Sequence, residues 1–199
     1  MGSFKPNQRT IEQFLLNLMR GWNSEETLEV RCIRENSRPH SMRFKPDKYL
    51  DAVQYIVAKN NTDNIYVCVN PVPGTTQGSA KDKDIKRSFF AFVDGDEKGA
   101  ADRARECDWF DIAMEVVTGV KPHFRNHIYY RFDNPLEDML QWTELQKLLS
   151  AYLNTDKVIH NPSRIMRVAG TVTYPNKKKQ ALGYSSELTR LIIGGNHVE

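Results

Sequence analysis

Apolar residues recur at helical spacing in three segments of the chain. Residues 8–22 predict an amphipathic helix with an apolar face of Ile11, Phe14, Leu15, Leu18 and Met19. Pro46 opens a second predicted helix, with an apolar side of Tyr49, Leu50, Val53, Ile56 and Val57. Pro135 begins a third, expected to run to about Leu153, with apolar positions at Leu136, Leu140, Leu145, Leu148 and Leu149. A short helix is also expected after Gly99.

Shorter apolar or alternating runs between these helices predict β-strands. Residues 28–33 alternate in polarity, and residues 64–69 form a second run. The run 89–93 is continuously apolar and aromatic, which predicts a central strand covered on both faces. Residues 71–84 are rich in Pro, Gly, Thr and Lys and predict a long exposed loop. Further strands are expected at 112–117, 128–132, 165–168, 172–174 and 182–184.

The order of these elements favours an α+β fold, because hairpin-like neighbouring strands are mixed with helices. The sequence has neither the G-x-G-x-x-G pattern of a Rossmann fold nor the G-x-x-x-x-G-K-[ST] pattern of a P-loop. Its 199 residues suit one domain, or two small lobes that share a core.

Composition narrows the class of protein further. Apolar residues make up 40% of the chain and charged residues 27%, which excludes a disordered or membranous protein. No apolar run approaches the roughly 20 residues that cross a bilayer, and the first residues lack the apolar stretch of a signal peptide. The three cysteines, Cys32, Cys68 and Cys107, are odd in number and widely spaced. They predict reduced, buried thiols in a cytoplasmic protein, and no membrane partner is expected.

Charge alone does not predict nucleic-acid binding, since the net charge is only +3. Positive residues nevertheless gather near the C-terminus, where five lie within sixteen residues: Arg164, Arg167, Lys177, Lys178 and Lys179. Such a run is usually a solvated face. The alternative is a surface that contacts a nucleic-acid backbone.

The candidate chemistry begins with Asp94-Gly95-Asp96, at the end of the apolar run. Residues two apart in a strand point to the same face, about 6.5 Å apart along the chain. Two carboxylates so placed repel each other unless a cation lies between them, and oxygen ligands favour Mg²⁺ or Mn²⁺. Gly95 is expected to let a phosphate or an ion approach. A turn that simply closes the strand is the other interpretation.

A second group of polar residues lies between two predicted strands, from Thr118 to His127. If the second strand begins near Phe124, then Arg125 and His127 share a face and could both meet a triphosphate. His123 is a further candidate. Either histidine could instead be a surface or core residue.

A third group contains Asp156, followed by Arg164 and Arg167 on either side of an apolar stretch. One more acid from another segment would complete a three-carboxylate centre for two metal ions. Asp156 could equally serve as a helix-end or turn residue.

These three blocks, in this order, resemble the archaeo-eukaryotic primase superfamily, in its plasmid and phage branch of replication primase-polymerases. The first family motif is an apolar strand that ends in Asp-x-Asp, like Asp94 and Asp96. The second places a Ser/Thr-Gly turn before a histidine at the head of a strand, like Thr118-Gly119 and His127. The third supplies another metal-binding acid, for which Asp156 is the candidate, before a basic segment like 164–171.

The resemblance covers roughly residues 65–190 and implies a function. Asp94, Asp96 and Asp156 would hold two Mg²⁺ or Mn²⁺ ions for DNA-templated nucleotidyl transfer. The residues expected to bind the nucleotide are His127, His123, Arg125, Thr118, Arg164 and Arg167. Those expected to contact nucleic acid are Lys177, Lys178 and Lys179. The second motif is stretched by residues 122–125, so either histidine could bind the triphosphate, with His127 favoured.

The resemblance also implies a two-lobed catalytic core across residues 1–199, with an N-terminal α/β part at about 1–85. An RRM-like sheet that bears the acids would occupy about 86–190, and the C-terminal helical domain of many members is expected to be absent. Expected partners are a single-stranded DNA template, NTP or dNTP, and a helicase or other replication protein, in the cytosol of a bacterial, phage or plasmid host. The alternatives are a non-catalytic single-strand-binding module for replication initiation, and a metal-dependent nuclease.

Overall fold

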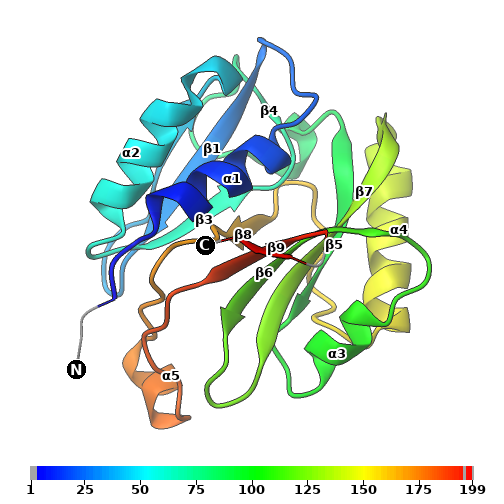
Figure 1. Cartoon of the computed structure of the whole chain (residues 1–199). Helices are drawn as coiled ribbons and strands as arrows, with labels where there is room; N and C mark the ends of the chain where they lie inside the picture. The colour runs from blue at the N-terminus through cyan, green and yellow to red at the C-terminus, as the bar shows by residue number, and fades with distance from the viewer. Residues whose placement is uncertain (1–3, 195, 199) are drawn as a thin grey trace.

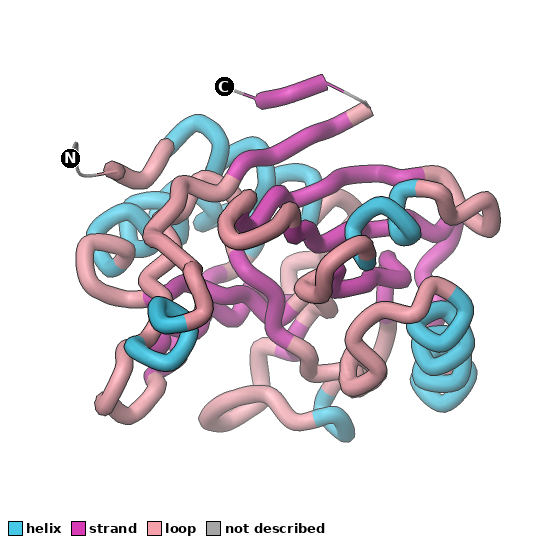
Figure 2. The backbone as a smooth tube through the Cα atoms, turned by 90° about the horizontal axis from the view of Figure 1, so that it is seen from below, coloured by secondary structure: helices cyan, strands magenta, loops and turns pink. Residues whose placement is uncertain are grey.

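Two antiparallel five-stranded sheets form the framework of the chain, which is described by a computed structural model over residues 4–194 and 196–198 (Figure 1). The predicted catalytic core across residues 1–199 also includes residues 1–3, 195 and 199, which lie outside the described residues. Most strands lie between the N-terminal helices and the long helix on the opposite side (Figure 2). The α+β prediction is therefore confirmed.

The first sheet has the order β2-β1-β3-β8, with β4 also paired to β1. Its strands are β1 (Glu26–Ile33), β2 (His40–Phe44), β3 (Asn64–Cys68), β4 (Val72–Pro73) and β8 (Ile165–Arg167). The N-terminal helices pack beside it: α1 (Gln8–Leu18), and α2 (Tyr49–Lys59) after a 3₁₀ turn at Pro46–Lys48. Because β8 pairs with β3, a segment from the second half of the chain completes this sheet.

The second sheet has the order β10-β9-β6-β7-β5. Its strands are β5 (Ser88–Gly95), β6 (Ile112–Gly119), β7 (Arg125–Leu136), β9 (Arg190–Ile193) and β10 (Asn196–Val198). The remaining helices are α3 (Ala100–Arg105), α4 (Met139–Tyr152) and α5 (Lys177–Ala181). Among the helices of the described residues, none is long and apolar enough to cross a membrane.

Strand β5 is an edge strand, which corrects the expectation that it is central. Its free edge is covered by side chains of α4. Trp142 Nε1 donates to the Phe90 carbonyl at 2.9 Å, and the Gln146 amide bonds both the N–H (3.0 Å) and the carbonyl (2.9 Å) of Phe92. The apolar run therefore reflects burial by α4 and the core, while side chains replace the missing strand.

One apolar core joins the two sheets. Tyr129 of β7 lies at its centre, with the rings of Phe14 from α1 and Phe90 from β5 both 6.1 Å away in edge-to-face geometry. Because this core spans both sheets, and β8 from the second half of the chain belongs to the first sheet, the division at about residue 85 stays a prediction. All three cysteines are buried and unpaired, as expected.

Several sequence predictions of local structure were wrong. Helix α4 begins at Met139, because Asp138 caps it and Pro135 still belongs to β7. Of the apolar positions predicted for this helix, Leu149 is buried and Leu145 is partly buried, whereas Leu140 and Leu148 are 82% and 62% exposed. Residues 172–174 make only an isolated bridge to Leu188, and residues 182–184 follow the short helix α5 rather than forming a strand.

Other parts of the chain were missed or only partly predicted. Strands β2, β9 and β10 were not predicted. Residues 71–84, expected to form an exposed loop, contain β4 and bury Val72 and Ala80. The Ala80 N–H holds this segment against the first sheet by donating to the buried Glu29 carboxylate at 2.7 Å. Helix α1 ends at Leu18, earlier than its apolar pattern suggested.

The sealing of β5 is tested by Gln146→Leu. The variant leaves the N–H and carbonyl of Phe92 without partners, and each unsatisfied buried group costs about 1–3 kcal/mol. We therefore expect the free energy of unfolding to fall by about 2–4 kcal/mol in urea titrations. Gln141→Leu, on the exposed side of the same helix, is the matched control and should change it little. Equal effects of the two variants would contradict this account of the edge.

Candidate active site

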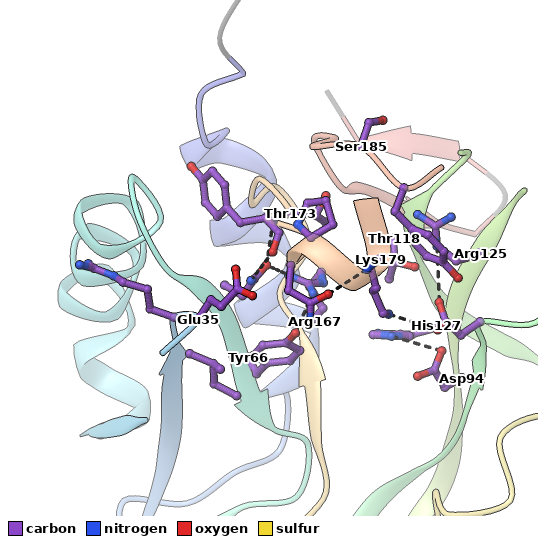
Figure 3. Close-up of a pocket in the computed structure, with 18 residues that line it drawn as sticks. Glu35, Tyr66, Asp94, Thr118, Arg125, His127, Arg167, Thr173, Lys179 and Ser185 are labelled. Atoms are coloured by element: carbon purple, nitrogen blue, oxygen red, sulfur yellow. Dashed lines mark hydrogen bonds and ion pairs between the residues drawn. The ribbon is translucent and has the colours of Figure 1, made fainter. Parts of the chain in front are cut away.

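A cavity of about 330 Å³ opens between the two sheets, and most of the predicted site residues line it (Figure 3). The second sheet contributes Asp94, Asp96, Thr118, Arg125 and His127. The first sheet contributes Asn64, Tyr66 and Arg167, and the segment after β8 contributes Lys179 and Tyr184. Residues from distant parts of the sequence thus meet at one place.

Asp94 and His127 face each other across the β5–β7 pair, where they are register partners. The Asp94 Oδ1 atom lies 3.6 Å from His127 Nε2, and the Asp94 side chain is 23% exposed. Burial, together with the negative charges of Asp96 and Asp156, raises the pKa of Asp94 to about 7. A cation bound nearby would therefore favour the ionised form of Asp94.

His127 itself does not supply that cation. Burial, helped by the charge of Arg167, lowers its pKa to about 3. Its ring is therefore neutral at physiological pH and can act as a hydrogen-bond donor without carrying charge.

Asp96 is contacted by two positive side chains. Arg125 Nε lies 3.5 Å from Oδ1, and Lys179 Nζ lies 3.4 Å from Oδ2. His123 Nε2 donates to the Asp96 carbonyl at 2.7 Å, so this histidine holds the main chain. Of the two candidate histidines, His127 lines the cavity and His123 is not among the described residues that do.

Asp156 lies beside the main chain of Asp94. Its N–H donates to the Asp94 carbonyl at 3.3 Å, and its own Oδ1 accepts from Val158 N at 3.0 Å. Asp156 therefore does form a turn, as its alternative interpretation held, although its charge reaches Asp94. Within residues 4–194 and 196–198, no group of three His, Cys, Asp or Glu side chains is arranged to hold a metal ion. The three-carboxylate centre stays a prediction.

The donor chemistry around Asp94 and Asp96 still fits a divalent cation. Asp94 near the end of β5 and Asp96 just after it both line the cavity, and the raised pKa of Asp94 indicates that its negative charge is poorly compensated by the protein. Oxygen donors of this kind suit Mg²⁺ or Mn²⁺.

Gly95 faces away from the cavity, which corrects its expected role. A Cβ atom at this position would lie 2.5 Å from Asn126 Oδ1 and 3.0 Å from the backbone of Ala101. The glycine is thus required for the close approach of α3 and β7 behind the site, and not for access by a phosphate or an ion.

The two predicted arginines of the third block have different surroundings. Arg167 lines the cavity and donates to Asn64 Oδ1 at 2.8 Å and to Tyr66 OH at 2.7 Å. Arg164 donates to the carbonyl of Val158, and its positive charge lowers the pKa of Asp94 in opposition to burial. The structure brings Arg167, but not Arg164, to the cavity wall.

The run of three lysines also divides. Lys179 lines the cavity beside Asp96, whereas Lys177 and Lys178 are exposed and have no ion-pair partner in the described part of the chain. Sequence reasoning missed Tyr184, whose ring lies under the Arg125 guanidinium at 4.4 Å, and Glu187, which pairs with it. Neither residue belongs to a sequence motif, and the pattern of apolar and polar residues around them does not predict that they lie near β6 and β7.

Comparison with solved structures shows the class of fold. The chain matches the archaeo-eukaryotic primase (AEP) domain of the cyanophage S-2L primase-polymerase with a TM-score of 0.65 and 22% identity, covering 98% of this chain and 95% of that one. The chain therefore has the fold of an AEP catalytic domain, and the resemblance seen in its motifs is confirmed at the level of the fold.

Two structures of the primase RepB′ are also similar. One matches with a TM-score of 0.60 and 10% identity over 93% of this chain, which spans 57% of that protein. The other, the catalytic domain of RepB′ in complex with initiator DNA, matches with a TM-score of 0.57 and 13% identity, covering 94% of this chain and 87% of that one. No protein-family model and no curated protein matches the sequence.

The raised pKa of Asp94 gives a testable pH dependence in metal-free buffer. The folded carboxyl keeps its proton up to about pH 7, whereas an unfolded one ionises near its ordinary value of 3.8. The free energy of unfolding should therefore fall as pH rises through this window, and Asp94→Asn should remove that fall. Relative to the parent protein, the variant should gain more stability at pH 8 than at pH 5 in urea titrations with EDTA.

The control for this comparison is Asp111→Asn, an exposed acid in the loop before β6. An Asp94→Asn effect of the same size at both pH values would show that the Asp94 carboxyl titrates normally.

Proposed function

We propose that the chain catalyses DNA-templated nucleotidyl transfer, as primer synthesis, DNA polymerisation or both, in the replication of a phage or plasmid. The single observation that carries the proposal is the arrangement around one cavity of an AEP fold. There, two carboxylates at the end of an apolar strand share the cavity wall with a neutral histidine and three cationic side chains: Arg125, Arg167 and Lys179.

Asp94 and Asp96 would hold two Mg²⁺ or Mn²⁺ ions, with Asp156 as the expected third ligand. When bound, the ions would activate a 3′-hydroxyl and neutralise the triphosphate and its leaving pyrophosphate. The poorly compensated charge of Asp94 supports this use of the site.

The triphosphate would be held by the other polar side chains that line the cavity. His127 is neutral and can donate a hydrogen bond from its ring, while Thr118 offers a hydroxyl. Arg167 provides a planar, permanently charged group suited to phosphate oxygens, and Arg125 would add its fixed positive charge beside Asp96. That His127 lines the cavity, while His123 bonds the main chain of Asp96, supports His127 as the nucleotide ligand.

The proposed partners are NTP or dNTP, a single-stranded DNA template, and a helicase or other replication protein. The RepB′ catalytic domain, which shares this fold, was solved with initiator DNA. In this chain, Lys177 and Lys178 are exposed next to the cavity-lining Lys179 and would supply sequence-independent affinity for a DNA backbone.

The proposal is tested by incubating the protein with primed and unprimed single-stranded DNA, Mn²⁺ and labelled nucleotides. Extension or primer synthesis supports nucleotidyl transfer. Cleavage without incorporation would favour a nuclease, and binding without either reaction would favour a non-catalytic replication module.

The double variant Asp94→Ala with Asp96→Ala should abolish incorporation, because it removes both carboxylates of the proposed metal site. Binding to single-stranded DNA, measured by fluorescence anisotropy, should largely survive. A double variant of two exposed loop acids, Asp108→Ala with Asp111→Ala, is the matched control and should incorporate normally. Full synthesis by the first variant would refute the mechanism.

The lysine run allows a second test within three residues. Lys177→Ala with Lys178→Ala should weaken single-stranded DNA binding and reduce the slope of log K against log salt by about 0.7 per lost phosphate contact. Lys179→Ala should instead alter the nucleotide KM, because Lys179 contacts Asp96 in the cavity. Identical effects of the two variants on DNA binding and on KM would contradict this division.

A further inference from the structure

We propose that Glu187, which lies outside all three motifs, is a positioning residue that holds the Arg125 guanidinium against Asp96. The catalytic consequence of this role rests on the proposed function, whereas the placement of Arg125 can be measured without it. Glu187 lies between α5 and β9, in a segment that the sequence did not connect with the site.

The main chain of Glu187 is fixed by one neighbour. Thr173 N donates to the Glu187 carbonyl at 2.8 Å, and the Glu187 N–H donates to Thr173 Oγ1 at 3.0 Å. Thr173 itself is buried and follows β8 in the chain. The glutamate is therefore presented from a rigid support, and its side chain is 13% exposed.

The Glu187 carboxylate binds three donors at the turn between β6 and β7. Val120 N donates to Oε2 at 2.8 Å, Lys121 N donates to Oε1 at 3.2 Å, and Arg125 Nη2 lies 3.3 Å from Oε1. One side chain thus fixes both the main chain of the turn and the guanidinium behind it.

Arg125 is enclosed so completely that its neighbours determine its direction. Its Nη1 donates to the carbonyls of Lys121 and His123, its Nε faces Asp96, and the ring of Tyr184 covers its plane at 4.4 Å. The side chain is only 5% exposed. Any Cβ atom at Gly119 would overlap the guanidinium, so the glycine forms the floor of the enclosure.

This enclosure shows why Glu187 matters at the cavity. A buried guanidinium that loses one of its two carboxylate partners carries uncompensated charge and must rearrange. Asp96 is its remaining carboxylate partner, and Asp96 is also the expected metal ligand. Removing the charge of Glu187 should therefore displace Arg125 relative to Asp96, although the Glu187 carboxylate itself bonds Val120, Lys121 and Arg125 rather than an expected metal ligand.

The experiment is a double-mutant cycle between Glu187→Gln and Arg125→Ala, measured by kcat/KM for nucleotide incorporation at a temperature where circular dichroism shows every variant folded. Glu187→Gln keeps the shape of the side chain and should lower kcat/KM about tenfold. In the Arg125→Ala background the same substitution should change it by less than about twofold, because its target is gone. Equal losses in both backgrounds, or no loss in the first, would overturn the proposal.

Two further variants separate positioning from a general loss of stability. Gly119→Ala places a Cβ atom against the Arg125 guanidinium and 2.7 Å from Glu187 Oε1, so it should disturb the same pair from the other side and reproduce the kinetic effect. Glu26→Gln is the matched control, because Glu26 also pairs with an arginine, Arg87, through bonds of 2.7 and 2.9 Å. It lies outside the cavity lining and should leave kcat/KM unchanged.

Arginine side-chain ¹⁵N–¹H NMR tests the placement independently of activity. The Nε–H signal of Arg125, assigned with Arg125→Lys, should move or broaden in Glu187→Gln and stay unchanged in Glu26→Gln. If the parent protein incorporated no nucleotide, the proposed function would fail, and the NMR signal would still decide the positioning role. An Arg125 signal that is identical in Glu187→Gln and the parent protein would overturn that role.

Discussion

The edge of β5 that lacks a neighbouring strand is the constraint on which the rest of the site depends. An edge strand presents unpaired main-chain groups, and buried groups of this kind must find partners. Trp142 and Gln146 of α4 provide them for Phe90 and Phe92, and the Asp156 N–H continues the same row at Asp94. The contacts that seal the strand therefore also bring the candidate third acid beside the first.

Sealing the strand in this way creates an electrostatic problem at its end. The burial that stabilises the apolar part of β5 also desolvates Asp94, and Asp96 and Asp156 add like charge. The protein compensates unevenly. Asp96 is paired with Arg125 and Lys179, whereas the ion-pair contact of Asp94 among the described residues is with the neutral His127. The charges of Lys179 and Arg164 offset this burial only in part, so Asp94 is the carboxyl that gains most from a bound cation.

Sequence patterns predicted those parts of the fold that depend on local chemistry. Burial made the run before Asp94 recognisable, and the alternation after Phe124 correctly placed Arg125 and His127 on one face of β7. The position of β5 at the edge of its sheet could not be predicted, because side-chain amide and indole groups replaced a neighbouring strand. Helix α4 was misplaced because its exposed face is also apolar, with Leu140 and Leu148 in solvent.

Residues that act through long-range contacts carry no local signal. Glu187 and Tyr184 lie about sixty residues from Arg125 in sequence, and their surroundings read as an ordinary polar segment. The chain after Arg167 nevertheless supplies α5 at the cavity, Glu187 behind Arg125 and β9 to the second sheet, after β8 has joined the first. The chain after Arg167 therefore closes the site between the sheets. The geometry of the motif residues depends on this segment, although it contains none of the three candidate metal ligands, Asp94, Asp96 and Asp156.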